Sequence, residues 1–320
     1  MKEKVFKGVF SALYSAYDNE MNVKEDTVRG MMDYQLKNGL NGFYVCGNTG
    51  ECSVLPEKTR RQMLEAAVKF NCGRGLIMAH VGATHFDETK RLLEHANEQK
   101  IDAVASLPPA LKAYYNVDEC IAYYEWMAKN STHPVFAYVT DAVQDPVLLA
   151  ERLAKIPNVD GIKLTIRDYY AFGKITAATG DRLNILNGPD ETMICGLSVG
   201  ADGAIGTSYN YMPETANEIY QNFIKSNLKT ALSYQRKLNS YIMLFAHANI
   251  ALWKSSMRAL ASTWDTRFFP LTNPRRKNTK NFWQALKKSA FPSFKKSNFT
   301  EYKNAGDVLS SALFRFTILN

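Results

Sequence analysis

The sequence contains no apolar run long enough to cross a membrane. A spanning helix needs roughly 18 or more consecutive apolar residues, and every hydrophobic stretch in this chain of 320 residues is interrupted well before that length. The opening residues, MKEKVFKG, include no uninterrupted apolar segment of the kind that signal peptides carry. We therefore expect a cytoplasmic protein without a membrane partner.

Cysteine and histidine are scarce and scattered. There are five of each, no two cysteines form a CxxC pair, and no histidine belongs to a recognisable metal-ligand motif. An odd number of widely separated cysteines favours reduced thiols over a disulfide framework or a structural zinc site. We accordingly expect free thiols and no bound metal. The cysteines are Cys46, Cys52, Cys72, Cys120 and Cys195.

Glycine-rich phosphate-binding loops are also missing. No GxGxxG or GxxxxGK[ST] pattern opens any expected helix, so the sequence gives no reason to expect a nucleotide. No other cofactor is indicated, and the expected partner is a small molecule.

Acidic residues are nearly absent from the last part of the chain. Residues 267–320 carry eleven Lys or Arg but only Glu301 and Asp307 as acids, whereas residues 1–266 carry a net charge of −1. The overall charge of +8 is therefore a property of this basic tail. Charged runs of this kind are usually solvated, and we expect no nucleic-acid-binding face on the body of the protein.

The sequence does contain a regular alternation of apolar, strand-like runs with amphipathic, helix-like stretches. Eight such units predict an α/β fold with parallel strands and favour closure into a (β/α)8 barrel, although a doubly wound open sheet fits the same pattern. We expect a barrel over residues 1–226 and a helical C-terminal extension with the basic tail over residues 227–320. Expected strands occupy residues 5–14, 42–45, 75–80, 101–105, 135–138, 158–165, 184–186 and 203–206, and expected helices occupy residues 23–37, a segment beginning at Pro56, 87–99, 117–129, 146–155, 169–178, 191–199 and 213–226.

A charged residue interrupts the apolar strand expected at residues 158–165, NVDGIKLT. Its neighbours Ile162 and Leu164 suit a buried strand, so Lys163 would carry its ammonium to a strand end where burying a charge is costly. Such a lysine commonly extends to solvent or pairs with a carboxylate. The functional alternative is a Schiff base, because an amine in an apolar pocket loses its proton more readily and the neutral amine attacks ketones.

Further polar residues follow other expected strands, at the ends where (β/α)8 barrels hold their active sites. Residues 47–51, GNTGE, form either an ordinary capped turn or a nest of N–H groups for a carboxylate. Tyr138 is either a packed aromatic residue or a proton relay beside the amine. The pair Asp190 and Glu191 either complements a helix dipole or accepts hydrogen bonds from a polyol.

Together these motifs resemble those of the class I pyruvate-dependent aldolases, the superfamily of dihydrodipicolinate synthases and N-acetylneuraminate lyases. The resemblance rests on GNTGE at 47–51, Tyr138, GIK at 161–163, GPDE at 188–191 and GADGAIG at 200–206. It implies a (β/α)8 barrel in which Lys163 forms an imine with a 2-keto acid and Tyr138 transfers protons. Thr49 and the adjacent N–H groups would hold the substrate carboxylate. The implied substrate-binding residues are Asn48, Thr49, Thr165, Gly188, Asp190, Glu191 and Thr207.

Within the superfamily, the far end of the substrate separates the activities. In the dihydrodipicolinate synthases that this chain resembles, an arginine stands five positions after the catalytic tyrosine. This chain has Val143 at that position. With GPDE at 188–191, this favours a sialic acid lyase, which would release N-acetylmannosamine and pyruvate. The alternatives are a 2-keto-3-deoxy sugar acid aldolase or dehydratase, a dihydrodipicolinate synthase-like enzyme, and a non-catalytic binding or regulatory barrel.

Two positions depart from the lyase pattern. Asn48 replaces a serine or threonine, and the usual Tyr-Asn-x-Pro reads Tyr-Val-Thr-Asp from Tyr138 onward. The resemblance also implies a homotetramer, in which a tyrosine near Tyr114 and Tyr115 would reach the site of a neighbouring subunit.

Overall fold

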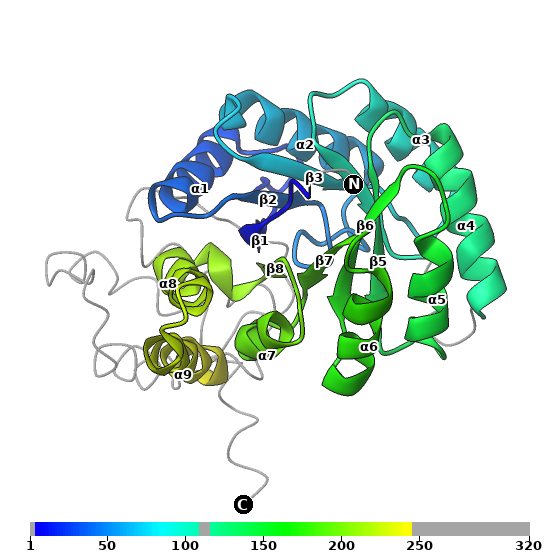
Figure 1. Ribbon diagram of the computed structural model, residues 1–320. Coiled ribbons are helices and arrows are strands. Elements are labelled where there is room, and N and C mark those ends of the chain that lie inside the picture. The colour runs from blue at the N-terminus through cyan, green and yellow to red at the C-terminus, as the bar shows by residue number, and fades with distance from the viewer. Residues whose placement is uncertain (1–3, 109–115, 245–320) are drawn as a thin grey trace, which may run out of the picture.

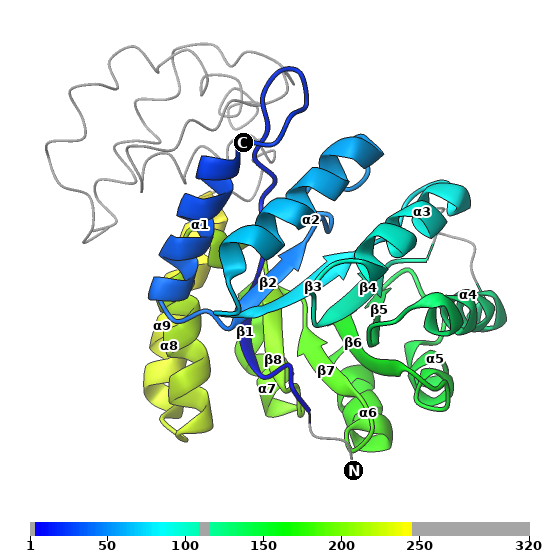
Figure 2. The ribbon, with the colours of Figure 1, turned by 90° about the horizontal axis from the view of Figure 1, so that it is seen from above.

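The computed structural model describes residues 4–108 and 116–244, which form a closed barrel of parallel strands surrounded by helices (Figure 1). The strands follow one another around the barrel in chain order, and β1 pairs with β8 to close it. Seen from above, the strands lie at the centre and the helices outside them (Figure 2). The closure confirms the (β/α)8 barrel and contradicts the open-sheet alternative.

The strands and helices alternate as the sequence predicts. The strands are β1 (Gly8–Ala12), β2 (Gly42–Val45), β3 (Leu76–His80), β4 (Ala103–Ser106), β5 (Val135–Thr140), β6 (Val159–Thr165), β7 (Asn184–Asn187) and β8 (Gly203–Gly206). The helices are α1 (Glu25–Lys37), α2 (Glu57–Asn71), α3 (Phe86–Asn97), α4 (Val117–Asn130), α5 (Pro146–Leu153), α6 (Tyr169–Thr179), α7 (Met193–Ser198), α8 (Pro213–Ile224) and α9 (Leu228–Leu244), with short 3-10 turns η1 (Asp190–Thr192) and η2 (Ser208–Asn210).

Two predicted elements differ from the structure by more than a shift of one or two residues at an end. The strand expected at residues 5–14 is shortened to β1, because the barrel register pairs β1 only with the short strands β2 and β8; Leu13 and Tyr14 beyond it are buried without being strand. The helix expected at 191–199 is divided into η1 and α7. There, the Gln235 side chain of α9 donates a hydrogen bond to the backbone carbonyl of Asp190 at 3.0 Å and so supports the separate turn.

The alternation of side chains along the strands divides the apolar interior into two clusters. One fills the barrel lumen, and the other lies between the strands and the surrounding helices. Residues at the upper end of the lumen form the floor beneath the carboxyl ends of the strands, where a site would lie. The lumen cluster comprises Phe6, Phe10, Ala12, Tyr44, Met78, Ala103, Ala105, Phe136, Tyr138, Leu186 and Ile205.

Three even-numbered strands begin with the same hydrogen-bonding device. An Asn or Asp just before the strand accepts the N–H of a residue in the preceding strand through its side-chain oxygen, and donates its own N–H to that residue's carbonyl. Paired bonds of this kind fix the register at the amino ends of three strand pairs. The side-chain bonds join Asn41 to Val9 at 2.9 Å, Asp102 to Ile77 at 2.7 Å and Asp202 to Ile185 at 2.8 Å.

Three further expectations concern the cysteines, membrane-spanning helices, and the basic tail together with two tyrosines. All five cysteines are free, as expected. Within residues 4–108 and 116–244, no helix is both long and apolar enough to span a membrane. The basic tail, Tyr114 and Tyr115 lie outside the described residues.

Replacing Asp202 tests the register device. Asp202→Ala removes the acceptor of the Ile185 N–H and the ion pair with Lys4 at 2.8 Å. A buried N–H left without its partner costs about 1–3 kcal/mol, so we expect a loss of this size in the free energy of unfolding, measured by urea denaturation. Asp181→Ala, at an exposed position before β7, is the control. Equal losses in the two variants would contradict the role of Asp202.

Candidate active site

Lys163 lies at the top of the barrel lumen. On β6 it is aligned with Tyr138 of β5 and Leu186 of β7, and it is only 6% exposed. Two residues earlier on the same face, Gly161 leaves space for the Phe136 ring, which a Cβ at that position would overlap. The low exposure contradicts the alternative in which the amine extends to solvent.

The amine of Lys163 lies between two aromatic rings from other strands. Its Nζ is 4.1 Å from the centroid of the Tyr138 ring and 4.5 Å from that of Tyr44. The rings stand nearly perpendicular, at 88°, with centroids 6.3 Å apart. In the part of the chain that the structure describes, no carboxylate lies within 4.0 Å of this amine. A desolvated cation over an aromatic face gains about 2 kcal/mol, so the rings take the place of a counter-ion.

Contacts with other residues hold the rings of Tyr138 and Tyr44 in place. The backbone N–H of Tyr138 donates to the Tyr124 hydroxyl at 3.3 Å, which in turn donates to the carbonyl of Ser106 at 2.7 Å. Tyr44 is 1% exposed, and its ring occupies the space that a side chain at Gly47 would need. Burial raises the pKa of Tyr44 well above its ordinary value, so the ring next to the amine stays a neutral phenol.

The ring of His80 packs against the Tyr44 ring, with the ring centroids 5.9 Å apart. Its Nε2 accepts the N–H of Leu107 at 3.2 Å. Burial, together with the charges of Arg60 and Lys163, holds the pKa of His80 well below its usual range. His80 therefore adds no second positive charge beside Lys163.

The loop after β2 brings Thr49 to the same end of the barrel. The chain reverses through Cys46 and Glu51, whose φ angles of 58° and 63° are left-handed. The hydroxyl of Ser15 fixes the loop by donating to the carbonyl of Gly50 at 2.8 Å. The Thr49 hydroxyl then lies 2.6 Å from the hydroxyl of Thr207, which follows β8. Asn48 stays exposed beside it.

Asp190, after β7, is buried and fastens the loop after β8. Its Oδ1 accepts the N–H of Thr207 at 3.2 Å, and its Oδ2 accepts that of Ser208 at 2.5 Å. Burial outweighs these two N–H groups and raises the pKa of Asp190 to about 6. Binding of a polyol by Asp190 stays a prediction, but its two oxygens already hold the protein backbone.

Glu191 lies nearer the rim of the site. Its carboxylate is 3.6 Å from Arg167, whose guanidinium is also 3.8 Å from Asp141 in the loop after β5. The side chain of Asn239 on α9 donates to the carbonyl of Glu191 at 2.9 Å. With the bond from Gln235, α9 therefore anchors the main chain of the acidic turn.

The remaining predicted residues meet between β6 and β7. A Cβ at Gly188 would overlap the hydroxyl of Thr165, and this hydroxyl has no hydrogen-bond partner among the described residues.

Val143, in the loop after β5, packs against the apolar cluster around the barrel. The geometry thus brings the predicted residues to one end of the barrel, where a ketone over the amine, a carboxylate near Thr49 and hydroxyls near Glu191 could be held together.

A model of the dihydrodipicolinate synthetase family matches residues 5–289 of the sequence. The chain belongs to this family. It is 32% identical over 256 residues to the N-acetylneuraminate lyase of Mediterraneibacter gnavus, an alignment covering 77% of this chain and 79% of that protein.

Solved structures agree with the family assignment. The wild-type sialic acid aldolase of Ruminococcus gnavus matches with a TM-score of 0.80 and 26% identity, covering 88% of this chain and 96% of that one. The N-acetylneuraminate lyase of Proteus mirabilis matches with a TM-score of 0.81 over 89% of this chain and 99% of that one; at 22% identity this likeness concerns the fold.

Sequence reasoning missed several residues that contact the predicted site residues. Tyr44 could have been found by strand parity, because the second strand places it on the lumen face with Gly42. Arg167, Gln235 and Asn239 carried no motif, and their contacts arise only when the loops and α9 are brought together.

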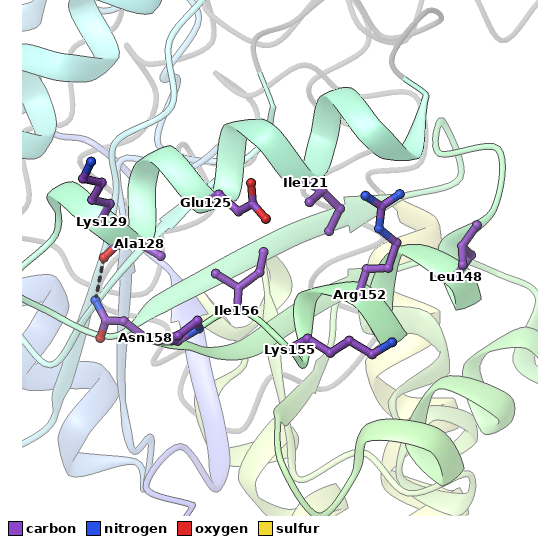
Figure 3. A pocket seen from close by; sticks show the side chains of 10 residues that line it. Ile121, Glu125, Ala128, Lys129, Leu148, Arg152, Lys155, Ile156 and Asn158 are labelled. Carbon is purple, nitrogen blue, oxygen red and sulfur yellow. Dashed lines mark hydrogen bonds between the residues drawn. The ribbon is translucent and has the colours of Figure 1, made fainter.

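A hollow of about 730 Å³ lies outside the barrel between α4 and α5 (Figure 3). Asn158 at one end donates to the carbonyl of Ala128 at 3.3 Å. The lining combines apolar residues with both basic and acidic side chains, namely Ile121, Ile156, Glu125, Lys129, Arg152 and Lys155. It holds none of the residues that surround Lys163. Among residues 4–108 and 116–244, no three His, Cys, Asp or Glu side chains gather as metal ligands would.

The raised pKa of Asp190 predicts a pH-dependent stability difference. Because the pKa rises from an ordinary value of 3.8 to about 6 on folding, the folded state binds more protons, and this contribution is complete below about pH 4 and is lost as pH rises through 6. Relative to Asp190→Asn, which does not titrate, the free energy of unfolding should fall by about 2 kcal/mol between pH 4 and 6.5. Glu191 is the charged neighbour that raises this pKa further.

Chemical denaturation of both proteins across this pH range measures the difference. The subtraction cancels the titration of all groups that the two proteins share. A difference that stays constant between pH 4 and 6.5 would contradict a buried, proton-binding Asp190.

Proposed function

We propose that the protein is a class I aldolase-type lyase that cleaves N-acetylneuraminate into N-acetylmannosamine and pyruvate through an imine on Lys163. The observation that carries this proposal is the buried Lys163 amine, held between Tyr44 and Tyr138 at the carboxyl end of the barrel. The lyase names of the relatives support the substrate.

In the proposed reaction, the neutral amine adds to the C2 ketone of the open-chain substrate. A C–N bond forms, and the ketone oxygen leaves as water after taking up two protons. Removal of the C4 hydroxyl proton then breaks the C3–C4 bond, and the electron pair moves into the iminium to give an aldehyde and an enamine. Protonation of C3 and addition of water release pyruvate and regenerate the amine. Tyr138, beside Nζ, carries protons in these steps.

The substrate extends from this amine in two directions. Its carboxylate lies at Thr49 and Asn48, where backbone N–H groups and hydroxyl groups can donate hydrogen bonds. Its sugar chain lies toward Gly188 and Glu191, whose carboxylate reaches the rim. The set is completed by Thr165, Asp190 and Thr207.

The loop after β5 favours a sugar substrate over a second carboxylate. Val143 occupies the position of the arginine in dihydrodipicolinate synthases and packs on the apolar cluster. A substrate with a second carboxylate would find no bidentate partner there. A 2-keto-3-deoxy sugar acid would use the same amine and differ only at its far end.

We further propose a homotetramer that acts in the cytoplasm, as the resemblance implies. The proposed division into a catalytic barrel, 1–226, and an extension, 227–320, is compatible with α9 as a helix that packs on the barrel and holds the turn after β7. Sedimentation analysis of the full chain tests the assembly.

Release of pyruvate from N-acetylneuraminate by the full chain tests the activity. Lys163→Met should lower kcat by more than about 1,000-fold, because the nucleophile is lost. Lys174→Met is the matched control, since Lys174 also lies over a tyrosine ring, 5.3 Å from the centroid of Tyr170, but on the outer helix α6. Equal activity of both variants would contradict the imine on Lys163.

A substrate panel separates the candidate activities. The enzyme is offered N-acetylneuraminate, a 2-keto-3-deoxy sugar acid, and pyruvate with aspartate semialdehyde. We expect the highest kcat/KM with N-acetylneuraminate. A preference for either other substrate would reassign the activity while keeping the imine chemistry.

A further inference from the structure

We infer that Thr207, besides its implied place among the substrate-binding residues, is a positioning residue for the carboxylate end of the substrate and acts through Thr49. The inference rests on the proposed function, in which a 2-keto acid forms an imine on Lys163. It gives the loop after β8 a part in recognising pyruvate itself.

The contact between the two threonines carries the argument. Their hydroxyl oxygens are 2.6 Å apart, although the residues are 158 positions apart in the sequence. β2 and β8 are the two neighbours of β1, so this bond crosses over the end of β1 and joins the loops on its two sides. Among the described residues, Thr207 is the hydrogen-bond partner of the Thr49 hydroxyl.

The number of hydroxyl protons decides whether Thr49 or Thr207 is the donor of this bond when an anion binds. Each hydroxyl has one proton to donate and can accept other hydrogen bonds. If Thr207 donates to Thr49, the proton of Thr49 is free to donate to a carboxylate, and the chain of donors strengthens each bond. Without Thr207, the Thr49 hydroxyl can rotate away from the orientation that a carboxylate needs.

The backbone of Thr207 is fixed on both sides. Its N–H donates to Asp190 at 3.2 Å, and its carbonyl accepts from the side chain of Asn210 at 2.9 Å. Asn210 is fully buried and also donates to the carbonyl of Ala12 on β1, at 2.6 Å. A residue whose backbone is fixed in this way can hold another side chain in place.

Pyruvate is the probe that separates the two roles, because it has the carboxylate and ketone but no sugar chain. Borohydride trapping of the full-length protein at increasing pyruvate concentration gives a half-saturation value. Thr207→Val keeps the shape and removes the hydroxyl, and we expect it to raise this value about tenfold, the effect of one lost hydrogen bond. Thr207→Ser restores the hydroxyl and should stay within about threefold of the wild type.

A double-mutant cycle shows whether Thr207 acts through Thr49. In a Thr49→Val background, Thr207→Val should cause no further change in half-saturation by pyruvate. Thr230→Val, at an exposed position on α9, is the control for the substitution itself.

Two outcomes would overturn the inference: Thr207→Val traps pyruvate as the wild type does and loses only N-acetylneuraminate turnover, or its effect persists unchanged without the Thr49 hydroxyl. Failure of the proposed function is recognised separately, because then the wild type itself would form no adduct with pyruvate.

Discussion

A buried amine above an apolar barrel lumen is the constraint on which the rest of the site depends. Removing a charge from water is costly, and this lysine has two ring faces beside it where a counter-ion would be expected. Aromatic faces stabilise a cation, so the same enclosure suits the iminium that the proposed reaction forms on Lys163.

This enclosure requires a closed barrel. Lys163, Tyr138 and Tyr44 come from β6, β5 and β2, and β2 and β6 lie on opposite sides of the closed sheet. Their side chains meet because lumen-facing residues of all strands converge, and because Gly161 leaves room for the packed ring below. The register bonds at the amino ends of the strands hold this convergence in place at a distance from the chemistry.

Around the amine, polar contacts join loops that follow different strands. Thr49 meets Thr207 across the end of β1, and Asp190 holds the backbone of Thr207 from the loop after β7. Helix α9 completes this arrangement by fixing the turn at Asp190 from outside the barrel. In the proposed complex, the two ends of the substrate would be bound by loops that share one hydrogen-bonded network.

The sequence predicts the barrel well because periodicity is a local property. It also locates Lys163, since a lysine in an apolar strand is unusual within a window of a few residues. Strand parity places Tyr44 on the lumen face, but its contact with Lys163 depends on a residue 119 positions away, so parity alone does not separate it from a packing tyrosine. The role of Asp190 was likewise only partly predictable. A pair of acids after a strand indicates a site, but only the fold shows that the carboxylate oxygens of Asp190 accept two N–H groups.

The most direct measurement of the central claim is peptide mapping of the full-length protein after borohydride reduction in the presence of pyruvate. The account predicts a single covalent adduct on the peptide that contains Lys163, and none when pyruvate is omitted. An unmodified Lys163, or an adduct spread over surface lysines, would contradict it.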